Sequence, residues 1–140
     1  MIIYCAGPIK GDKQFQPFYI EIVKHVSSLG HTALSEMNEK FKSKIPLSDN
    51  QIFKRNIKWM EGSNFIVAEA SSASTGVGFE IAFGLYNLKK PVLALCKKGE
   101  KSFSAMVAGC DSELLTIMHY SNQDEIKKII IQYINEKENI

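Results

Sequence analysis

The feature that most restricts the possible folds is a short apolar run followed by a glycine-containing loop and a helical pattern. Residues 65–68, Phe-Ile-Val-Ala, have the length and continuous hydrophobicity of a strand buried in a parallel sheet. The loop at residues 71–78 follows, and a helical pattern begins at Phe79. Free backbone N–H groups and the positive end of a helix dipole meet at such a loop. The sequence therefore predicts an α/β protein with an anion site at this loop.

One carboxylate, Glu80, falls in the first turn of this predicted helix. An acid in the first turn commonly just complements the helix dipole. Its position between Phe79 and Ile81, just after two glycines and against a loop of phosphate size, favours instead a carboxylate that acts on a phosphorylated sugar. Local sequence alone leaves both interpretations open.

Strand and helix patterns alternate along the rest of the 140 residues. Further strands are predicted at residues 2–6, 31–34, 91–96 and 114–119, and helices at residues 15–29, 47–62, 79–89 and 124–136. The polar segment 38–48 is predicted to be a loop. The alternation predicts one domain over residues 1–140, a three-layer, Rossmann- or flavodoxin-like αβα fold with about five parallel strands. Ligands of such sheets bind at the carboxyl ends of the strands.

Composition and charge exclude several classes of protein. A net charge of +2 with dispersed lysines does not indicate a nucleic-acid surface. Three cysteines without a CxxC pair, and histidines remote from them, make a zinc site or another metal unexpected. Cys5 and Cys96 lie in apolar runs and are expected to be reduced core residues. No apolar run approaches the roughly 20 residues of a membrane span, so we expect a cytoplasmic protein without cofactor or membrane partner.

Residues spread along the chain carry a resemblance to a known family. They lie in the segments IYCAGPIKG, FKRNIKWM, SNFIVAEASSASTGVGFEIA and FSAM, which together span nearly the whole sequence. In this order and spacing, the chain resembles the nucleoside 2-deoxyribosyltransferase superfamily and, within it, the 2'-deoxynucleoside 5'-monophosphate N-glycosidases. The resemblance implies an enzyme that cleaves the N-glycosidic bond of a nucleotide. The residues that carry it are Tyr4, Gly7, Asn56, Ser74, Gly76, Gly78, Glu80 and Ser104.

The resemblance also implies roles for single residues. Glu80 matches the family's nucleophile, and Tyr4 matches a tyrosine beside it. Ser74 and Gly76 match loop positions that hold the 5'-phosphate, and Gly78 is expected to bind substrate from the same loop. A carboxylate can stabilise an oxocarbenium-like transition state and then trap the anomeric carbon covalently. Glu80 must be ionised for this, and a helix N-terminus is expected to lower its pKa.

Two further segments are expected to contact the substrate. Ser104 resembles a serine that completes the phosphate site of the neighbouring subunit in a homodimer, and Met106 of the same segment is included in the predicted binding site. The glycine-flanked loop after the first strand matches a loop that covers sugar and phosphate. Its candidate binding residues are Gly7, Ile9, Lys10 and Gly11, although Lys10 alone has the character of a solvated loop lysine.

Asn56 is a departure from the family, which usually carries an aspartate at this position to position or protonate the departing base. Asparagine donates and accepts hydrogen bonds but delivers no proton at neutral pH. The departure implies that protonation is handled differently, that activity is slow, or that the preferred base differs.

Three functions fit the sequence. The first is a nucleoside 5'-monophosphate N-glycosidase, favoured because the loop SSASTGVG lacks the aspartate of transferases that act on unphosphorylated nucleosides. The second is a 2'-deoxyribosyltransferase that passes the sugar to another base. The third is a non-catalytic nucleotide-binding module, which Asn56 keeps open and Glu80 opposes. A dinucleotide site is disfavoured because GVGFE lacks the third glycine.

Overall fold

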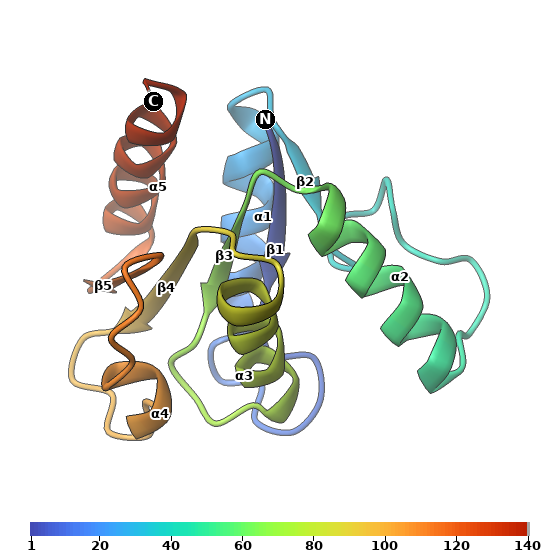
Figure 1. Ribbon diagram of the computed structural model, residues 1–140, viewed down its shortest axis with the longest axis horizontal. Helices are drawn as coiled ribbons and strands as arrows, with labels where there is room; N and C mark the ends of the chain where they lie inside the picture. The colour runs from blue at the N-terminus through green and yellow to red at the C-terminus, as the bar shows by residue number, and fades with distance from the viewer. Residues whose placement is uncertain (140) are drawn as a thin grey trace.

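The computed structural model describes residues 1–139 and contains one parallel sheet with helices on both faces (Figure 1). The strands are β1 (Ile2–Ala6), β2 (Thr32–Leu34), β3 (Phe65–Glu69), β4 (Val92–Lys97) and β5 (Leu115–Tyr120). They lie in the order β2-β1-β3-β4-β5, and every neighbouring pair is parallel. The predicted three-layer α/β fold with about five parallel strands is confirmed.

The helices divide between the two faces of the sheet (Figure 1). One hydrophobic cluster joins the sheet to α1 (Gln16–Ser28) and α5 (Gln123–Glu138). The other joins it to α2 (Asp49–Gly62), α3 (Thr75–Ala82) and the short α4 (Ala105–Ala108). A π-helical turn, η1 (Phe83–Asn87), continues α3. All of β3 is buried because both of its faces are covered, which explains its uninterrupted apolar sequence.

The alternation of side chains along β1 decides which of them reach each face. Ile3 and Cys5 pack into the cluster of α1 and α5, whereas Tyr4 and Ala6 pack into the cluster of α2 and α3. Successive residues of a strand point to opposite faces, so Tyr4 lies on the α2 and α3 side. The expectation that Cys5 and Cys96 are core residues is confirmed, since both are buried.

The start of α3 differs from the sequence prediction. The helix begins at Thr75, not Phe79, and Ser74 is its N-cap, with Oγ accepting a hydrogen bond from the Val77 N–H at 3.3 Å. The first turn contains two glycines and few apolar residues, so it has no hydrophobic periodicity to reveal it. The prediction that Glu80 lies in the first turn is therefore wrong. Glu80 is in the second turn, and α3 ends at Ala82 before the π-helical turn.

The start of α2 was predicted well, because a capping box marks it. Ser48 Oγ accepts from the Gln51 N–H at 3.2 Å, and Gln51 Oε1 accepts from the Ser48 N–H at 2.9 Å. The predicted loop at residues 38–48 contains no helix or strand.

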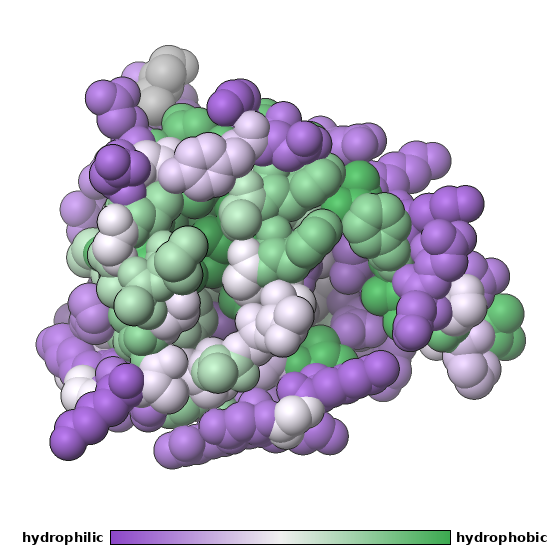
Figure 2. All heavy atoms as spheres, turned by 60° about the horizontal axis from the view of Figure 1, so that its bottom comes forward, coloured by the Kyte–Doolittle hydropathy of each residue, from purple (hydrophilic) through white to green (hydrophobic). Residues whose placement is uncertain are grey.

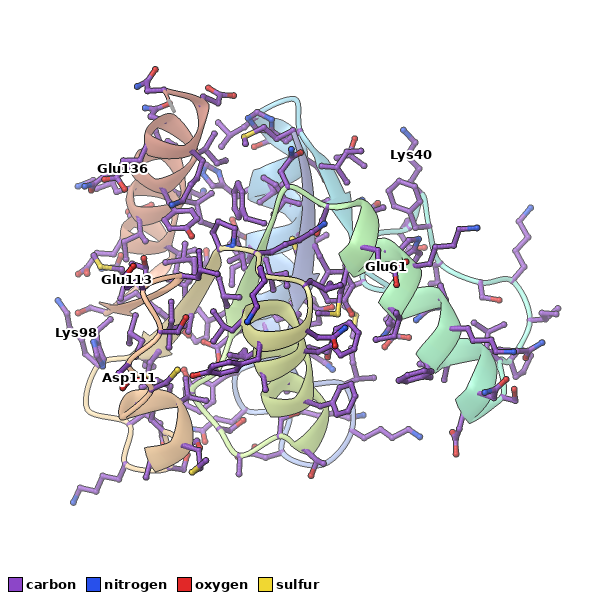
Figure 3. The ribbon with its side chains drawn as sticks, viewed as in Figure 1. Lys40, Glu61, Lys98, Asp111, Glu113 and Glu136 are labelled. Carbon is purple, nitrogen blue, oxygen red and sulfur yellow. The ribbon has the colours of Figure 1, made fainter. Side chains whose placement is uncertain are left out.

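The surface separates hydrophobic from charged side chains. In Figure 2 the molecule is turned so that its lower side in Figure 1 comes forward. Hydrophobic residues gather in the middle of this face, and hydrophilic residues surround them. Charged side chains such as Lys98, Asp111 and Glu136 lie at the periphery of the molecule (Figure 3). Within residues 1–139, no helix has the length and hydrophobicity needed to cross a membrane.

Candidate active site

A cleft of about 680 Å³ opens beyond the carboxyl ends of β1 and β3. Its walls are the loop after β1, the N-terminal half of α3 with the loop before it, and one side of α2. β1 and β3 are neighbours in the sheet, and the chain leaves them in opposite directions, toward β2 on one side and β4 on the other. This is the switch point where doubly wound sheets bind ligands.

Tyr4 and Glu80 meet in a small pocket that adjoins this cleft, from elements far apart in the sequence. The Tyr4 hydroxyl donates a short hydrogen bond to Glu80 Oε2. Tyr4 is 3% exposed, and Glu80 is half-buried. Burial and the adjacent Glu80 carboxylate raise the pKa of Tyr4, so the phenol stays protonated and acts as a donor. The expected contact between these two residues is present.

The pKa of Glu80 moves in the direction opposite to the sequence expectation. Burial raises it to about 7, and the charge of Glu36 adds to the rise, while the Tyr4 hydrogen bond and the Arg55 charge oppose it. The expected lowering by a helix N-terminus fails because Glu80 lies in the second turn, where the dipole effect has faded, and desolvation dominates. Glu80 is therefore a carboxylate poised between its two protonation states near neutral pH.

The opposite end of the cleft offers hydrogen-bond donors to an anion. Ser74, Thr75 and Gly76 line it, and the first N–H groups of α3 have no acceptor within the helix. Ser74 Oγ uses a lone pair to cap the helix, which leaves its hydroxyl proton for a ligand. A Cβ on Gly76 would lie 3.9 Å from Glu80 Oε1, an ordinary van der Waals contact, so this end of the cleft borders the carboxylate. Lys10 is exposed at the rim of the same cleft.

The loop after β1 is shaped by a contact that sequence reasoning missed. A Cβ on Gly7 would lie 2.1 Å from the Cγ atom of Tyr19, so only glycine admits the ring at this position. Tyr19 Oη donates to the Cys5 carbonyl oxygen at 3.0 Å and lies 2.6 Å from Ser35 Oγ. Gly7, Ile9 and Gly11 line the cleft beside it, as expected. Gly7 thus has a packing role as well as its predicted place in the binding loop.

The wall formed by α2 is mainly apolar. The helix buries only Met60 completely, and its apolar side faces the cleft. Phe53 of α2 and Phe79 of α3 are both about half exposed and meet edge to face across the cleft, with ring centroids 6.2 Å apart. A flat apolar group such as a nucleobase suits this wall. The apolar lining residues of α2 are Ile52, Phe53, Ile57 and Met60.

Asn56 is the polar residue on this wall, and its neighbour fixes its orientation. Arg55 Nε donates a hydrogen bond to Asn56 Oδ1 at 3.0 Å, and Arg55 Nη2 lies 3.4 Å from Glu36 Oε2. The guanidinium also stacks over Trp59 at 4.6 Å from the ring centroid. Since Nε only donates, the atom facing it is the amide oxygen, and the Asn56 amide N–H groups remain for a ligand. Asn56 and Glu36 both line the cleft.

Four of the predicted site residues do not line this cleft. Tyr4 lines the small pocket beside it, together with Glu80. Gly78 lies within α3, where a Cβ would meet no atom within 4 Å. Ser104 is the N-cap of α4, with Oγ accepting from the Met106 N–H at 3.2 Å, and Met106 is 86% exposed. Within residues 1–139, no group of three or more His, Cys, Asp or Glu side chains is placed to hold a metal ion.

Sequence comparisons identify the family of this chain. The family model described as nucleoside 2-deoxyribosyltransferase matches residues 3–136. A 5-hydroxymethyl-dUMP N-hydrolase from Esox lucius is 31% identical over 140 residues, which cover 95% of each chain. A protein from Thermofilum pendens, provisionally named 2'-deoxynucleoside 5'-phosphate N-hydrolase 1, is 31% identical over 128 residues, 89% of each chain. The chain belongs to the nucleoside 2-deoxyribosyltransferase family, as the resemblance implied.

Solved structures share the fold. A CMP N-glycosidase from Clostridium botulinum superposes with a TM-score of 0.67 at 12% identity and covers 94% of this chain and 98% of its own. A 2-deoxyribosyltransferase from Bacillus psychrosaccharolyticus gives a TM-score of 0.65 at 20% identity, with 89% of each chain covered. At these identities the likeness concerns the fold.

The hydrogen bond and the burial of the Tyr4–Glu80 pair lead to a testable prediction for the pKa of Glu80. We expect the Glu80 carboxyl to titrate near pH 7, and Tyr4→Phe to raise its pKa further, because the hydrogen bond that favours the charged form is lost while burial is kept. Carbon-detected NMR of the labelled side-chain carboxyl measures both values. A lower Glu80 pKa in Tyr4→Phe would contradict the assignment.

Proposed function

We propose that this protein hydrolyses the N-glycosidic bond of (2'-deoxy)nucleoside 5'-monophosphates, releasing the free base and the sugar 5-phosphate. The observation that carries the proposal is the Tyr4–Glu80 pair, whose Glu80 carboxylate lines the same cleft as the hydrogen-bond donors at the start of α3. The names of the related N-hydrolases agree with this chemistry.

Glu80 is proposed to be the nucleophile. Its carboxylate attacks C1' of the sugar as the C1'–N bond breaks, and the bonding electrons leave with the base. Water then attacks C1' of the glycosyl ester, releases Glu80, and supplies the proton that the base needs. Tyr4 holds the reactive oxygen in place through its hydrogen bond. Because the pKa of Glu80 is about 7, base release should rise with pH through neutrality as the carboxylate ionises.

Asn56 is proposed to assist departure of the base by hydrogen bonding. The Arg55 contact turns the Asn56 amide oxygen away and leaves the N–H groups to meet an acceptor on the base. A hydrogen bond of this kind stabilises a departing anion without transferring a proton.

We propose that the 5'-phosphate binds at the N-terminus of α3, through the amides of this turn and the hydroxyl of Ser74. Lys10 at the cleft rim supplies a positive charge. Helix N-termini favour anions through their free N–H groups and dipole.

A homodimer is proposed to complete the site with Ser104. Ser104 and Met106 lie outside the cleft of their own chain, at the exposed start of α4, and the Ser104 hydroxyl proton is free to bind an anion. Large hydrophobic side chains are exposed on the same side of the sheet, which favours an interface there. They are Phe79 (51% exposed), Tyr86 (56%) and Met106 (86%).

A 2'-deoxyribosyltransferase is the second candidate, because the matching family model carries that description. Incubation of a nucleotide with a second free base separates the two. Formation of a new nucleotide indicates transfer, and sugar phosphate with two free bases indicates hydrolysis.

Replacing Glu80 tests the proposed nucleophile. Glu80→Gln should nearly abolish base release while the protein still folds and binds nucleotide, measured by chromatography of the free base and by calorimetry. It should also stabilise the protein at pH 8. Since the pKa is raised above its ordinary value of 4.5 in the folded protein, the wild type loses stability as pH rises through about 7, and glutamine does not ionise. Full activity of Glu80→Gln would refute the covalent mechanism.

Removing the phosphate from the substrate tests the anion site. Losing a charge-assisted contact costs roughly 1.5–3 kcal/mol, or about 10- to 150-fold in apparent affinity. We expect kcat/KM for a deoxynucleoside to fall below that of its 5'-monophosphate by at least this factor. Ser74→Ala should reduce the difference in kcat/KM between the two substrates, because it removes one proposed phosphate donor. Equal turnover of both substrates would favour the transferase interpretation.

Asn56→Asp tests the family departure. Arg55 donates to this position, so the new carboxylate should be held ionised and should not serve as an acid at neutral pH. We expect turnover to gain less than the roughly 10²–10⁴-fold that general acids contribute. The double variant Asn56→Asp, Arg55→Gln should gain more turnover, since the positive charge that keeps the new carboxylate ionised is gone. A full gain in the single variant, measured as base release at pH 7, would show that Arg55 does not control this position.

Mixed dimers test the role of Ser104. Glu80→Ala and Ser104→Ala chains should each be weak alone, whereas a mixture exchanged through partial unfolding should recover activity. In the mixed dimer, one site combines Glu80 of the second chain with Ser104 of the first. No recovery, or full activity from a stable monomer in light scattering, would rule out the shared site.

A further inference from the structure

Glu69, at the carboxyl end of β3, is a buried carboxylate that the proposed mechanism does not use. It is 1% exposed and does not line the cleft. Strand alternation puts it on the face of Phe65 and Val67, the α1 and α5 side of the sheet, behind the site. An ionised carboxylate is costly to bury unless hydrogen bonds replace its hydration.

Three hydrogen bonds serve this carboxylate, and two come from one residue. Glu69 Oε1 accepts from the Ser71 N–H at 2.8 Å, and Oε2 accepts from the Ser71 hydroxyl at 2.9 Å and from the Tyr120 hydroxyl at 2.5 Å. Burial raises the pKa of Glu69, and these hydrogen bonds oppose the rise. Ser71 is itself fully buried. Because Glu69 accepts from both its N–H and its hydroxyl, Glu69 fixes the backbone and the side chain of Ser71.

Ser71 passes this constraint to two other segments. Its Oγ accepts from the Lys97 N–H at 2.8 Å, at the end of β4, and its carbonyl oxygen lies 3.1 Å from Ser102 Oγ, which donates. Tyr120 ends β5. The ends of three neighbouring strands and the segment that leads to Ser104 are therefore joined around Glu69 and Ser71.

The conformation of the loop from Ser71 to the N-cap Ser74 depends on contacts with other segments. Ser72 is 8% exposed, and its hydroxyl has no hydrogen-bond partner among the described residues. A buried hydroxyl without a partner is unfavourable, so other contacts must hold the loop in this conformation. The hydrogen bonds that join Ser71 to Glu69, Lys97 and Ser102 are contacts at its start, and Glu69 makes two of the four.

We propose that Glu69 is a positioning residue for phosphate recognition, an inference that rests on the proposed function. By fixing Ser71, its carboxylate sets the conformation of the loop up to Ser74 and of the segment that carries Ser102 and Ser104. Both segments supply the donors assigned to the phosphate. Donors that bind a charged group act best when they are held in place before binding, and small displacements weaken them strongly.

Two substitutions at the ends of this network separate positioning from stability. Glu69→Gln keeps the shape but has one acceptor oxygen. In one orientation of the amide, its NH2 group faces the Ser71 N–H, donor against donor. In the other orientation, the NH2 group replaces the oxygen that accepted the Ser71 hydroxyl proton. Tyr120→Phe is the matched control, because it also removes a buried hydrogen bond to Glu69 but leaves both bonds to Ser71.

The measurement is kcat/KM for a deoxynucleoside 5'-monophosphate and for the same deoxynucleoside. Glu69→Gln should lower the nucleotide value roughly 10- to 100-fold, mainly through KM, and leave the nucleoside value nearly unchanged. Tyr120→Phe should lower the melting temperature and leave the ratio of the two values as in the wild type. Should Glu69→Gln fail to fold, Ser71→Ala is expected to change the ratio in the same way.

Equal loss for both substrates, or an unchanged ratio in a folded Glu69→Gln protein, would overturn the proposal and leave Glu69 a purely structural residue. Calorimetric binding of inorganic phosphate separates this failure from failure of the proposed function, because it needs no turnover. Weaker phosphate binding by Glu69→Gln than by wild type supports the positioning role even if no nucleotide is cleaved. The same affinity in both proteins refutes it even if nucleotides are cleaved.

Discussion

The hydrogen bond from Tyr4 to Glu80 is the interaction on which the candidate site depends. It joins residues 76 positions apart and fixes a carboxylate where burial raises its pKa to about 7. Tyr4 is held by β1 between β2 and β3, and Glu80 is held by α3 as it packs on the same face. The parallel pairing of β1 with β3 therefore serves chemistry as well as stability. It brings a protonated phenol to a carboxylate that would otherwise lack a partner.

The helices on the two faces of the sheet bury their apolar side chains to different extents. The side of α1 and α5 is a continuous core that includes Tyr19, Tyr120 and Tyr133. On the other side, α2 buries only Met60 completely and leaves Ile52, Phe53 and Ile57 along the cleft. A wall of this kind can accept a flat apolar group without rearranging the core. The aromatic pair Phe53–Phe79 connects the two walls at the cleft.

Two carboxylates flank the loop after β3, and their surroundings give them different properties. Glu69 receives three hydrogen bonds and joins strand ends to the loop. Glu80 receives one, from Tyr4, and faces the cleft. Desolvation raises the pKa of both, but only Glu80 is open to a ligand. A saturated carboxylate suits positioning, whereas a carboxylate with unused lone pairs suits attack on an electrophile.

Hydrophobic periodicity in the sequence was enough to predict the parallel α/β fold, because burial on two sheet faces leaves a regular pattern, and polar composition was enough to predict the loop at residues 38–48. Motif resemblance identified the family and brought Tyr4 and Glu80 together. The start of α3, the raised pKa of Glu80 and the Arg55 contact that orients Asn56 had no such pattern. Capping, desolvation and side-chain orientation depend on neighbours that only tertiary packing supplies. Glu69 shows this most clearly, since its two partner residues, Ser71 and Tyr120, come from the next loop and from the last strand, and nothing in the local sequence of β3 reveals them.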